Sequence, residues 1–305
     1  MLALKIKDII FKNPIMVASG TYGYGNEVSD FVDLSKFGAI ITKSVTRNPR
    51  EGNPPPRIFE VDSGMLNSIG LANLGVEKYV EEKIPYLNKI KTHVIINIAG
   101  TRVDDYIETL EILEAADSNH IGYEINISCP NVKEGGMEFG VSREMTKELT
   151  MELRSRTKKI LIMKLSPNVT SIADIGLGAQ EGGADAVSAI NTVVGMGIDI
   201  NTKEPRLSTI MGGLSGPAIK PIAIANVFKL YKTLNIPIIG IGGISNSSDI
   251  IEFLLSGAKF IQLGTINYKF PNLISSLEDE LKEYLNKNSI NSIEKLIGKI
   301  IIENK

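Results

Sequence analysis

The stretch Ile236–Gly264, IPIIGIGGISNSSDIIEFLLSGAKFIQLG, decides the fold of this chain. Its apolar run Ile236–Ile241 predicts a buried strand, Ser248–Ser256 has the apolar spacing of a helix, and Phe260–Leu263 predicts a second strand. A strand, a helix and a strand in this order form a unit with parallel strands. The stretch therefore indicates an α/β fold that is built by repeating this unit.

The same alternation runs through the rest of the chain. The candidate strands are Ile15–Ala18, Ala39–Thr42, His93–Ile98, Ile121–Ile127, Ile160–Leu165, Ala186–Ile190, Ile236–Ile241 and Phe260–Leu263. The helical patterns between them are Val76–Lys91, Arg102–Ala116, Arg143–Lys159, Ile172–Glu181, Ala218–Leu234 and Ser248–Ser256. Eight strands favour a (β/α)₈ TIM barrel over a doubly wound sheet. We expect one domain over residues 1–305, opened by a β-hairpin at Ala3–Pro14 and completed by closing helices at Leu273–Lys305.

Composition excludes several classes of protein. Hydrophobic residues make up 43% of the chain and charged residues 22%, as in a globular protein with a large core. A formal net charge of −2 argues against nucleic-acid binding. Lys5 interrupts the apolar N-terminus too early for a signal peptide, and no apolar run reaches the roughly 18 residues of a membrane span. We therefore expect a cytoplasmic protein that contacts neither membrane nor nucleic acid.

Polar residues and glycines recur where the predicted strands end. Barrel enzymes carry their chemistry at the carboxyl ends of the strands. The residues at these ends are Ser19, Lys43, Ser44, Asn97, Asn126, Lys164, Ser166, Asn191, Thr192, Gly242, Gly243, Gly264 and Thr265. Any one of them is explained as a loop residue, but their recurrence around the barrel predicts a shared site.

Two glycine-containing turns follow the last two strands. Gly242-Gly243 and Gly264-Thr265 stand where barrels commonly bind phosphate through backbone N–H groups, and Gly216 could add a third contact. Each turn could also be a plain tight turn. Two such turns on adjacent strands favour a cofactor that carries phosphate. The segment Gly195–Gly197 lacks the third glycine of a dinucleotide-binding fingerprint.

Lys43 and Lys164 end strands whose interiors are apolar. A buried ammonium is costly unless it meets an anion. One interpretation is structural pairing with a glutamate. The other is stabilisation of a negative charge on a substrate carboxylate or a reduced flavin.

Cys129, the only cysteine, follows a predicted strand and is flanked by Ser128 and Pro130. It could be a buried small hydrophobe, or a base or nucleophile at a strand exit. His93 and His120 fall at the starts of strands, on the face of a barrel that serves stability. Cys129 is therefore the candidate general base. A single cysteine cannot hold an iron–sulfur cluster, and no spacing of His and carboxylates predicts a metal site.

The connection between the second and third strands exceeds forty residues. It contains the polar, glycine-containing segment Asn67–Asn73. Connections of this length in compact domains are often functional.

Taken together, these segments resemble dihydroorotate dehydrogenase over nearly the whole chain. The motifs that carry the resemblance, in order, are Val17-Ala18-Ser19-Gly20-Thr21, Thr42-Lys43-Ser44-Val45-Thr46, Met65-Leu66-Asn67-Ser68-Ile69-Gly70-Leu71, Asn126-Ile127-Ser128-Cys129-Pro130-Asn131 and Ile239-Gly240-Ile241-Gly242-Gly243. A cysteine in place of the membrane class's serine, and no N-terminal extension, resemble the soluble class 1. Within that class, Asn131–Gly136 and Gly212–Pro221 resemble the NAD-linked subtype, 1B.

The resemblance implies a flavoprotein that oxidises (S)-dihydroorotate to orotate in de novo pyrimidine (UMP) biosynthesis. It implies FMN on this chain, bound by Ser19, Lys43, Ser44, Asn97, Asn126, Lys164, Ile190, Gly216, Gly242, Gly243, Gly264 and Thr265. It implies a substrate site made by Lys43, Asn67, Ser68, Ile69, Gly70, Leu71, Asn126, Asn191 and Thr192. Cys129 would take the proton from substrate carbon 5, Lys164 would stabilise the reduced flavin, and the loop Pro130–Gly140 could close over the site.

The 1B resemblance also implies a partner subunit. That subunit would carry FAD and a 2Fe–2S cluster and pass electrons to NAD⁺, in a heterotetramer of two catalytic and two electron-transfer chains. The alternatives are a fumarate-linked class 1A enzyme or a relative of dihydropyrimidine dehydrogenase. From other classes, the alternatives are a Schiff-base aldolase that uses Lys164 and a flavin-binding barrel without catalysis.

Overall fold

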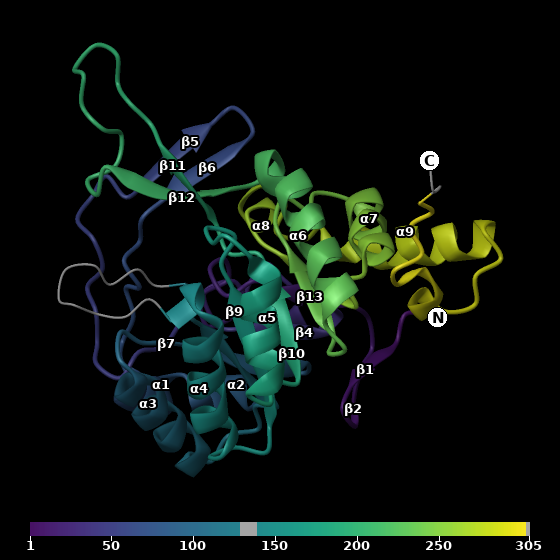
Figure 1. The fold of residues 1–305 in the computed structure, drawn as a ribbon, viewed down its shortest axis with the longest axis horizontal. Coiled ribbons are helices and arrows are strands. Elements are labelled where there is room, and N and C mark those ends of the chain that lie inside the picture. The colour runs from purple at the N-terminus through teal and green to yellow at the C-terminus, as the bar shows by residue number, and fades with distance from the viewer. Residues whose placement is uncertain (129–138, 303–305) are drawn as a thin grey trace.

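The computed structural model describes residues 1–128 and 139–302, and its centre is a closed barrel of eight parallel strands (Figure 1). In order around the barrel they are β10 (Ala186–Ala189), β13 (Ile238–Ile241), β14 (Phe260–Leu263), β3 (Ile15–Val17), β4 (Ala39–Ile41), β7 (His93–Ala99), β8 (Gly122–Asn126) and β9 (Ile160–Leu165). These are the eight strands that the sequence predicts, with ends that differ by at most two residues. The (β/α)₈ barrel is confirmed.

Helices cover the outside of the barrel. They are α3 (Val103–Ala115), α4 (Arg143–Arg154), α5 (Ile172–Glu181), α6 (Lys220–Thr233) and α7 (Ser247–Ser256). A single 3₁₀ turn, η1 (Leu34–Lys36), stands in the first strand-to-strand connection, and two further 3₁₀ turns, η2 (Phe139–Val141) and η3 (Pro217–Ile219), precede α4 and α6. In the part of the chain that the structure describes, no helix is long and apolar enough to cross a membrane.

Two helix predictions need correction. The predicted helix Val76–Lys91 is two short helices, α1 (Val76–Glu82) and α2 (Ile84–Leu87). Pro85 stands in the first turn of α2, where a proline starts a helix but could not continue one. The predicted helix Arg143–Lys159 ends at Arg154, because the following residues turn the chain into β9.

The N-terminal β-hairpin is confirmed, and it packs against the amino end of the barrel. It consists of β1 (Leu4–Ile6) and β2 (Ile9–Phe11). The ring of Phe11 is fully buried, and its centroid lies 5.0 Å from those of His93 and Phe260, which begin two barrel strands.

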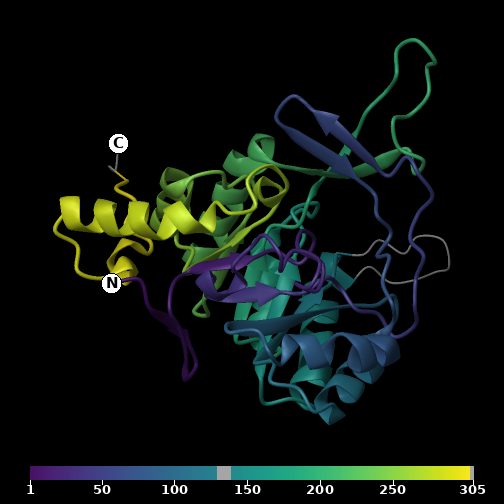
Figure 2. The ribbon, with the colours of Figure 1, turned by 180° about the vertical axis from the view of Figure 1, so that it is seen from behind.

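The C-terminal helices are also confirmed, and they lie close to the N-terminus (Figure 2). They are α9 (Ile274–Lys287) and the 3₁₀ turn η4 (Ile293–Leu296), and the short helix α8 (Ile266–Lys269) lies between β14 and α9. The backbone N–H of Ile293 donates to the carbonyl of Met1 at 2.9 Å, which joins the two ends of the chain.

A second sheet, which the sequence analysis does not predict, projects from the barrel (Figure 1). Its antiparallel strands, in spatial order, are β11 (Val193–Met196), β12 (Met211–Ser215), β6 (Gly64–Asn67) and β5 (Ile58–Val61). The long connection after β4 therefore contains a hairpin as well as α1 and α2, and Asn67 ends one of the hairpin's strands rather than lying in a loop. The register Asn67↔Gly213 joins this hairpin to the connection that follows β10.

Candidate active site

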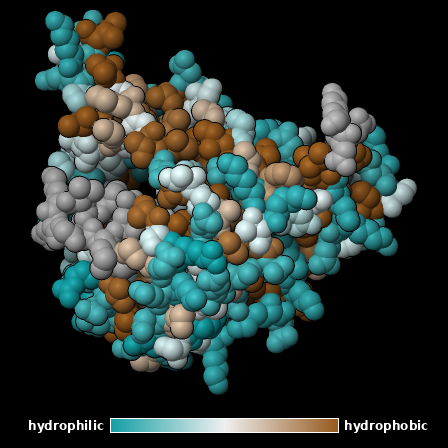
Figure 3. All heavy atoms as spheres, in the orientation of Figure 1, coloured by the Kyte–Doolittle hydropathy of each residue, from teal (hydrophilic) through white to brown (hydrophobic). Residues whose placement is uncertain are grey.

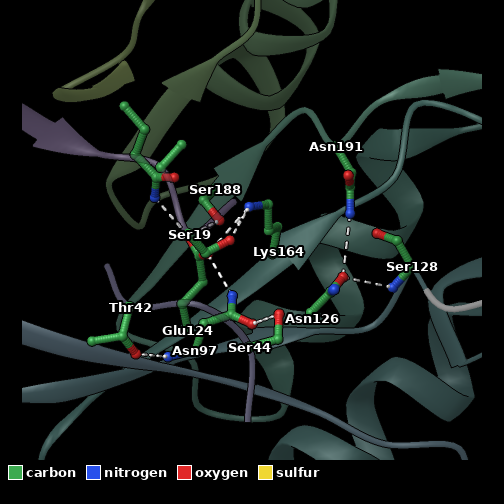
Figure 4. Close-up of polar contacts among 12 residues, drawn as sticks. Ser19, Thr42, Ser44, Asn97, Glu124, Asn126, Ser128, Lys164, Ser188 and Asn191 are labelled. Carbon is green, nitrogen blue, oxygen red and sulfur yellow. Dashed lines mark hydrogen bonds and ion pairs between the residues drawn. The ribbon is translucent and has the colours of Figure 1, made fainter. Parts of the chain in front are cut away.

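A buried carboxylate, Glu124, stands at the centre of the polar residues inside the barrel (Figure 4). Side chains along a strand alternate between its two faces. Tyr123 therefore points to the helix layer, where its hydroxyl donates to Glu114 of α3 at 2.8 Å. Its neighbour Glu124 points into the barrel and is completely buried.

Four donors from four strands converge on Glu124. Its Oε1 accepts from Asn97 Nδ2 at 2.7 Å and lies 3.3 Å from Lys164 Nζ. Its Oε2 accepts from Ser188 Oγ at 2.9 Å and from Gln262 Nε2 at 2.6 Å. A buried charge is tolerated when its polar atoms are paired in this way. The network thus fixes the carboxylate and its donors in one arrangement.

The predicted cofactor residues Ser19, Ser44, Asn97 and Lys164 belong to this network. Lys164 Nζ also donates to Ser19 Oγ at 3.1 Å, and Ser44 Oγ donates to Asn97 Oδ1 at 2.6 Å. The structural interpretation of Lys164, pairing with a glutamate, is therefore confirmed. Because its side chain remains 8% exposed, that pairing is compatible with a ligand contact at the rim.

Lys43 differs from Lys164 because no described carboxylate forms an ion pair with it. Burial lowers the pKa of Lys43, Glu27 acts in the opposite direction, and the nearby guanidinium of Arg57 lowers the pKa further. A half-buried cation beside a second cation attracts an anion such as a carboxylate. Arg57 was not singled out from the sequence, because it lies in the connection for which no strands were predicted.

Asn126 and Asn191 meet at the ends of β8 and β10 (Figure 4), and Thr192 directly follows Asn191. Asn191 Nδ2 donates to Asn126 Oδ1 at 3.2 Å, and the backbone N–H of Thr192 donates to Asn191 Oδ1 at 2.7 Å. Asn168, which was not predicted from the sequence, holds the backbone at Thr192 and Val194 in place through two hydrogen bonds. Its Nδ2 donates to the Thr192 carbonyl at 3.0 Å, and its Oδ1 accepts from the Val194 N–H.

The segment Asn67–Leu71 is held in place by residues outside it. Asn53 accounts for two contacts: its N–H donates to the Ile69 carbonyl at 3.0 Å, and its Nδ2 donates to the Ser68 carbonyl at 2.9 Å. Gly70 has φ +75°, and a Cβ there would lie 2.6 Å from the Asn53 nitrogen, so the turn requires glycine. The buried hydroxyl of Ser68 has no hydrogen-bond partner among the described residues.

The two glycine turns lie side by side at the carboxyl ends of β13 and β14. The register Ile241↔Gln262 places Gly243 beside Gly264. Gly243 has φ +75°, whereas a Cβ on Gly264 would meet nothing closer than 3.9 Å and so would enter open space. Among the described residues, the N–H groups of Gly243, Gly264 and Thr265 find no acceptor. Unpaired N–H groups beside open space suit a phosphate.

Three further cofactor predictions have structural roles. Gly242 and Gly216 have φ of +127° and +102°, and a Cβ on Gly216 would lie 2.6 Å from Gly64 Cα. Gly216 directly follows β12 and thus lets the chain pass close to Gly64 at the start of β6, in keeping with the tight-turn interpretation. Ile190 is 2% exposed, and its N–H donates to the Ile241 carbonyl. Whether these residues contact a cofactor stays a prediction.

Cys129 and residues 130–138 of the predicted closing loop lie outside the described residues. The assignment of Cys129 as the base therefore stays a prediction. Ser128, which precedes it, has a buried hydroxyl without a described partner.

The two histidines lie at the amino end of the barrel, as the sequence predicts. His93 is the first residue of β7, and its Nε2 lies 2.9 Å from the Ile10 carbonyl. His120 precedes β8, and burial lowers its pKa to about 4. Neither lies with the rim residues. Within residues 1–128 and 139–302, no group of three or more His, Cys, Asp or Glu is placed to hold a metal ion.

Comparison with known proteins gives a consistent result. The family model for dihydroorotate dehydrogenase matches residues 1–285. The dihydroorotate dehydrogenase B (NAD(+)) catalytic subunit of Bacteroides thetaiotaomicron is 48% identical over 297 residues, which cover 97% of this chain and 98% of that protein. The proteins of the same name from Caldicellulosiruptor saccharolyticus and Thermoanaerobacter pseudethanolicus are 45% and 43% identical, with 99% of each chain covered.

Proposed function

The chain belongs to the dihydroorotate dehydrogenase family, and on this basis we propose that it is the FMN-dependent catalytic subunit of an NAD-linked, class 1B enzyme. Its reaction is the oxidation of (S)-dihydroorotate to orotate in pyrimidine biosynthesis. The observation that carries this proposal is the convergence of Ser19, Ser44, Asn97 and Lys164 in one network at the carboxyl ends of four strands.

The rim residues fit FMN. The unpaired N–H groups of Gly243, Gly264 and Thr265 would bind its phosphate. Ser19, Ser44, Asn97 and Lys164 would contact its ring system. Bound FMN supplies a two-electron acceptor that takes a hydride from the substrate.

The chain's own residues would bind the substrate and move the proton. The Lys43 ammonium would pair with the substrate carboxylate, because it lacks an ion-pair partner among the described residues. Asn67, Asn126 and Asn191 carry amides that can both donate to and accept from the pyrimidine ring. The Cys129 thiolate would take the proton from carbon 5 while the hydride leaves carbon 6, and the C5–C6 double bond of orotate forms.

The electrons would leave through a separate subunit. The chain has one cysteine, whereas an iron–sulfur cluster needs several thiolates. We therefore propose a partner that carries FAD and a 2Fe–2S cluster and reduces NAD⁺, in a heterotetramer of two copies of each chain.

Exposed apolar side chains on the second sheet and its connection support protein contacts (Figure 3). They are Val194, Met196, Ile198, Ile200, Ile210 and Met211.

The test compares electron acceptors under anaerobic conditions. The FMN-loaded chain is given dihydroorotate with NAD⁺, with fumarate, or with NAD⁺ and a co-expressed partner. We expect NAD⁺ reduction only with the partner. Full-rate NAD⁺ reduction by the isolated chain would contradict the partner, and efficient fumarate turnover would assign the chain to class 1A. A flavin-free chain that borohydride traps on a ketone would instead be an aldolase.

A further inference from the structure

Glu124 is a buried charge to which the proposed chemistry gives no role. Its carboxylate is surrounded by four described donors, two at each oxygen, which come from Asn97, Lys164, Ser188 and Gln262. Because a carboxylate only accepts, Asn97 must present its NH₂ to Glu124 and its carbonyl oxygen to Ser44. Glu124 thus determines which way the Asn97 amide faces.

The same carboxylate also controls the charge of the site. Lys164 Nζ lies 3.3 Å from Glu124 Oε1, and neither side chain is more than 8% exposed, so water screens the pair weakly. The pair has a net charge near zero. It therefore stabilises an anion beside Lys164 less than an unpaired ammonium would.

We propose that Glu124 is a positioning residue that orients Lys164 and Asn97 and lowers the reduction potential of the bound flavin. The inference rests on the proposed function, because it requires FMN beside Lys164. An unopposed lysine would hold electrons on the flavin by stabilising its reduced anion. With its charge offset by Glu124, the reduced flavin passes electrons onward more readily, as delivery to a low-potential acceptor requires.

The experiment is an anaerobic redox titration of FMN-loaded protein against reference dyes, without dihydroorotate. Glu124→Gln should change the two-electron equilibrium constant at least tenfold in favour of the reduced flavin. This change raises the midpoint potential by about 30 mV or more. Lys164→Gln should lower it, and the double variant should lie between the two single variants. Glu114→Gln is the matched control, since Glu114 pairs with Lys159 at the other end of the barrel, and its potential should be unchanged.

An unchanged or lowered potential in Glu124→Gln would overturn the inference. If that variant fails to fold, the double variant is compared with Lys164→Gln, and the loss of Glu124 should again raise the potential. The comparison of the double variant with Lys164→Gln isolates the effect of Glu124, so equal midpoint potentials in these two variants would also overturn the inference. A wild-type chain that binds no FMN would instead contradict the proposed function, and the inference with it.

Discussion

Two glutamate–lysine pairs lie at opposite ends of the barrel. Adjacent residues of β8 take part in them, because Tyr123 donates to the glutamate of one pair and Glu124 is the glutamate of the other. At the amino end, Lys159 Nζ lies 3.1 Å from Glu114 Oε1, and the side chains of Glu114 and Lys159 are 27% and 29% exposed. At the carboxyl end, Glu124 and Lys164 lie 3.3 Å apart with side chains 0% and 8% exposed. The distances are nearly equal, but the surroundings differ. An ion pair's role is therefore set by what surrounds it rather than by its length.

The amino-end pair fastens a helix to a strand. Glu114 of α3 also accepts from Tyr123 and from Thr157 Oγ1, at 2.8 and 2.7 Å. Burial alone would raise the pKa of Glu114, but these hydrogen bonds and Lys159 hold it below its ordinary value. The carboxyl-end pair instead joins strands whose ends form the proposed ligand site. The comparison thus separates a structural end of the molecule from the end that carries the proposed site.

The largest expected effect is on chemistry at the carboxyl end. Cys129→Ala should keep FMN but slow flavin reduction by dihydroorotate by about 10²–10⁴-fold, because general base catalysis contributes that much. Cys129→Ser should be intermediate, since a hydroxyl is a weaker acid than a thiol. Stopped-flow absorbance in a single turnover measures this rate. His120→Gln at the amino end is the control, and near-normal reduction by Cys129→Ala would exclude Cys129 as the base.

Stability should distinguish the two pairs next. Lys164→Ala should lower the free energy of unfolding by about 3 kcal/mol, because it leaves a buried carboxylate with three neutral donors. Lys159→Ala should lower it by about 1 kcal/mol or less, because its pair is partly exposed. Urea unfolding of the FMN-free proteins measures both. Equal losses of unfolding free energy in the two variants would contradict the proposed difference between the two ion pairs.

A pH effect is expected at the amino end. The pKa of His120 is lowered from 6.5 to about 4 by burial and by Lys159. Between these values the unfolded chain binds more protons, so stability falls as the pH falls. Going from pH 7 to pH 5 should remove about 2 kcal/mol from the free energy of unfolding. Urea unfolding of His120→Gln should show a smaller loss, and an identical loss would refute this assignment.

The smallest effect concerns substrate binding by Lys43. Lys43→Met should weaken dihydroorotate binding by about tenfold or more, as expected for a hydrogen bond to a charged group. Because the pKa of Lys43 is lowered, the wild-type affinity should fall as the pH rises toward that pKa, where the ammonium is lost. Binding titrations over alkaline pH measure this. The variant should lack the dependence, and a parallel decline in both proteins would contradict the role of Lys43.

The sequence predicted the features that are encoded by short local patterns, namely the barrel strands and the polar residues at their ends. The eight barrel strands are short apolar runs, and residues at or just after their carboxyl ends make up the proposed site. Glu124 was missed as an individual residue, although a charge between Tyr123 and Ile125 in a buried strand was a visible signal. The expectation that a rim lysine pairs with some glutamate was correct for Lys164, whereas no carboxylate among the described residues forms an ion pair with Lys43.

The second sheet could not be predicted from the sequence, and the reason is physical. β6 and β12 are short, only partly buried strands, and they are separated by more than 140 residues in the sequence. Their pairing depends on the barrel, which brings the two connections together. Asn53 and Arg57 were missed because they lie in the connection for which no strands were predicted. Asn168 was missed because its partners Thr192 and Val194 lie more than 20 positions away in the sequence.

The most direct test of the central claim is a stoichiometric reduction. The purified FMN-loaded chain is mixed anaerobically with one equivalent of dihydroorotate, while flavin absorbance is recorded and orotate is quantified. The account predicts bleaching of the flavin with one orotate formed per FMN reduced. A flavin that stays oxidised, with no orotate formed, would contradict it.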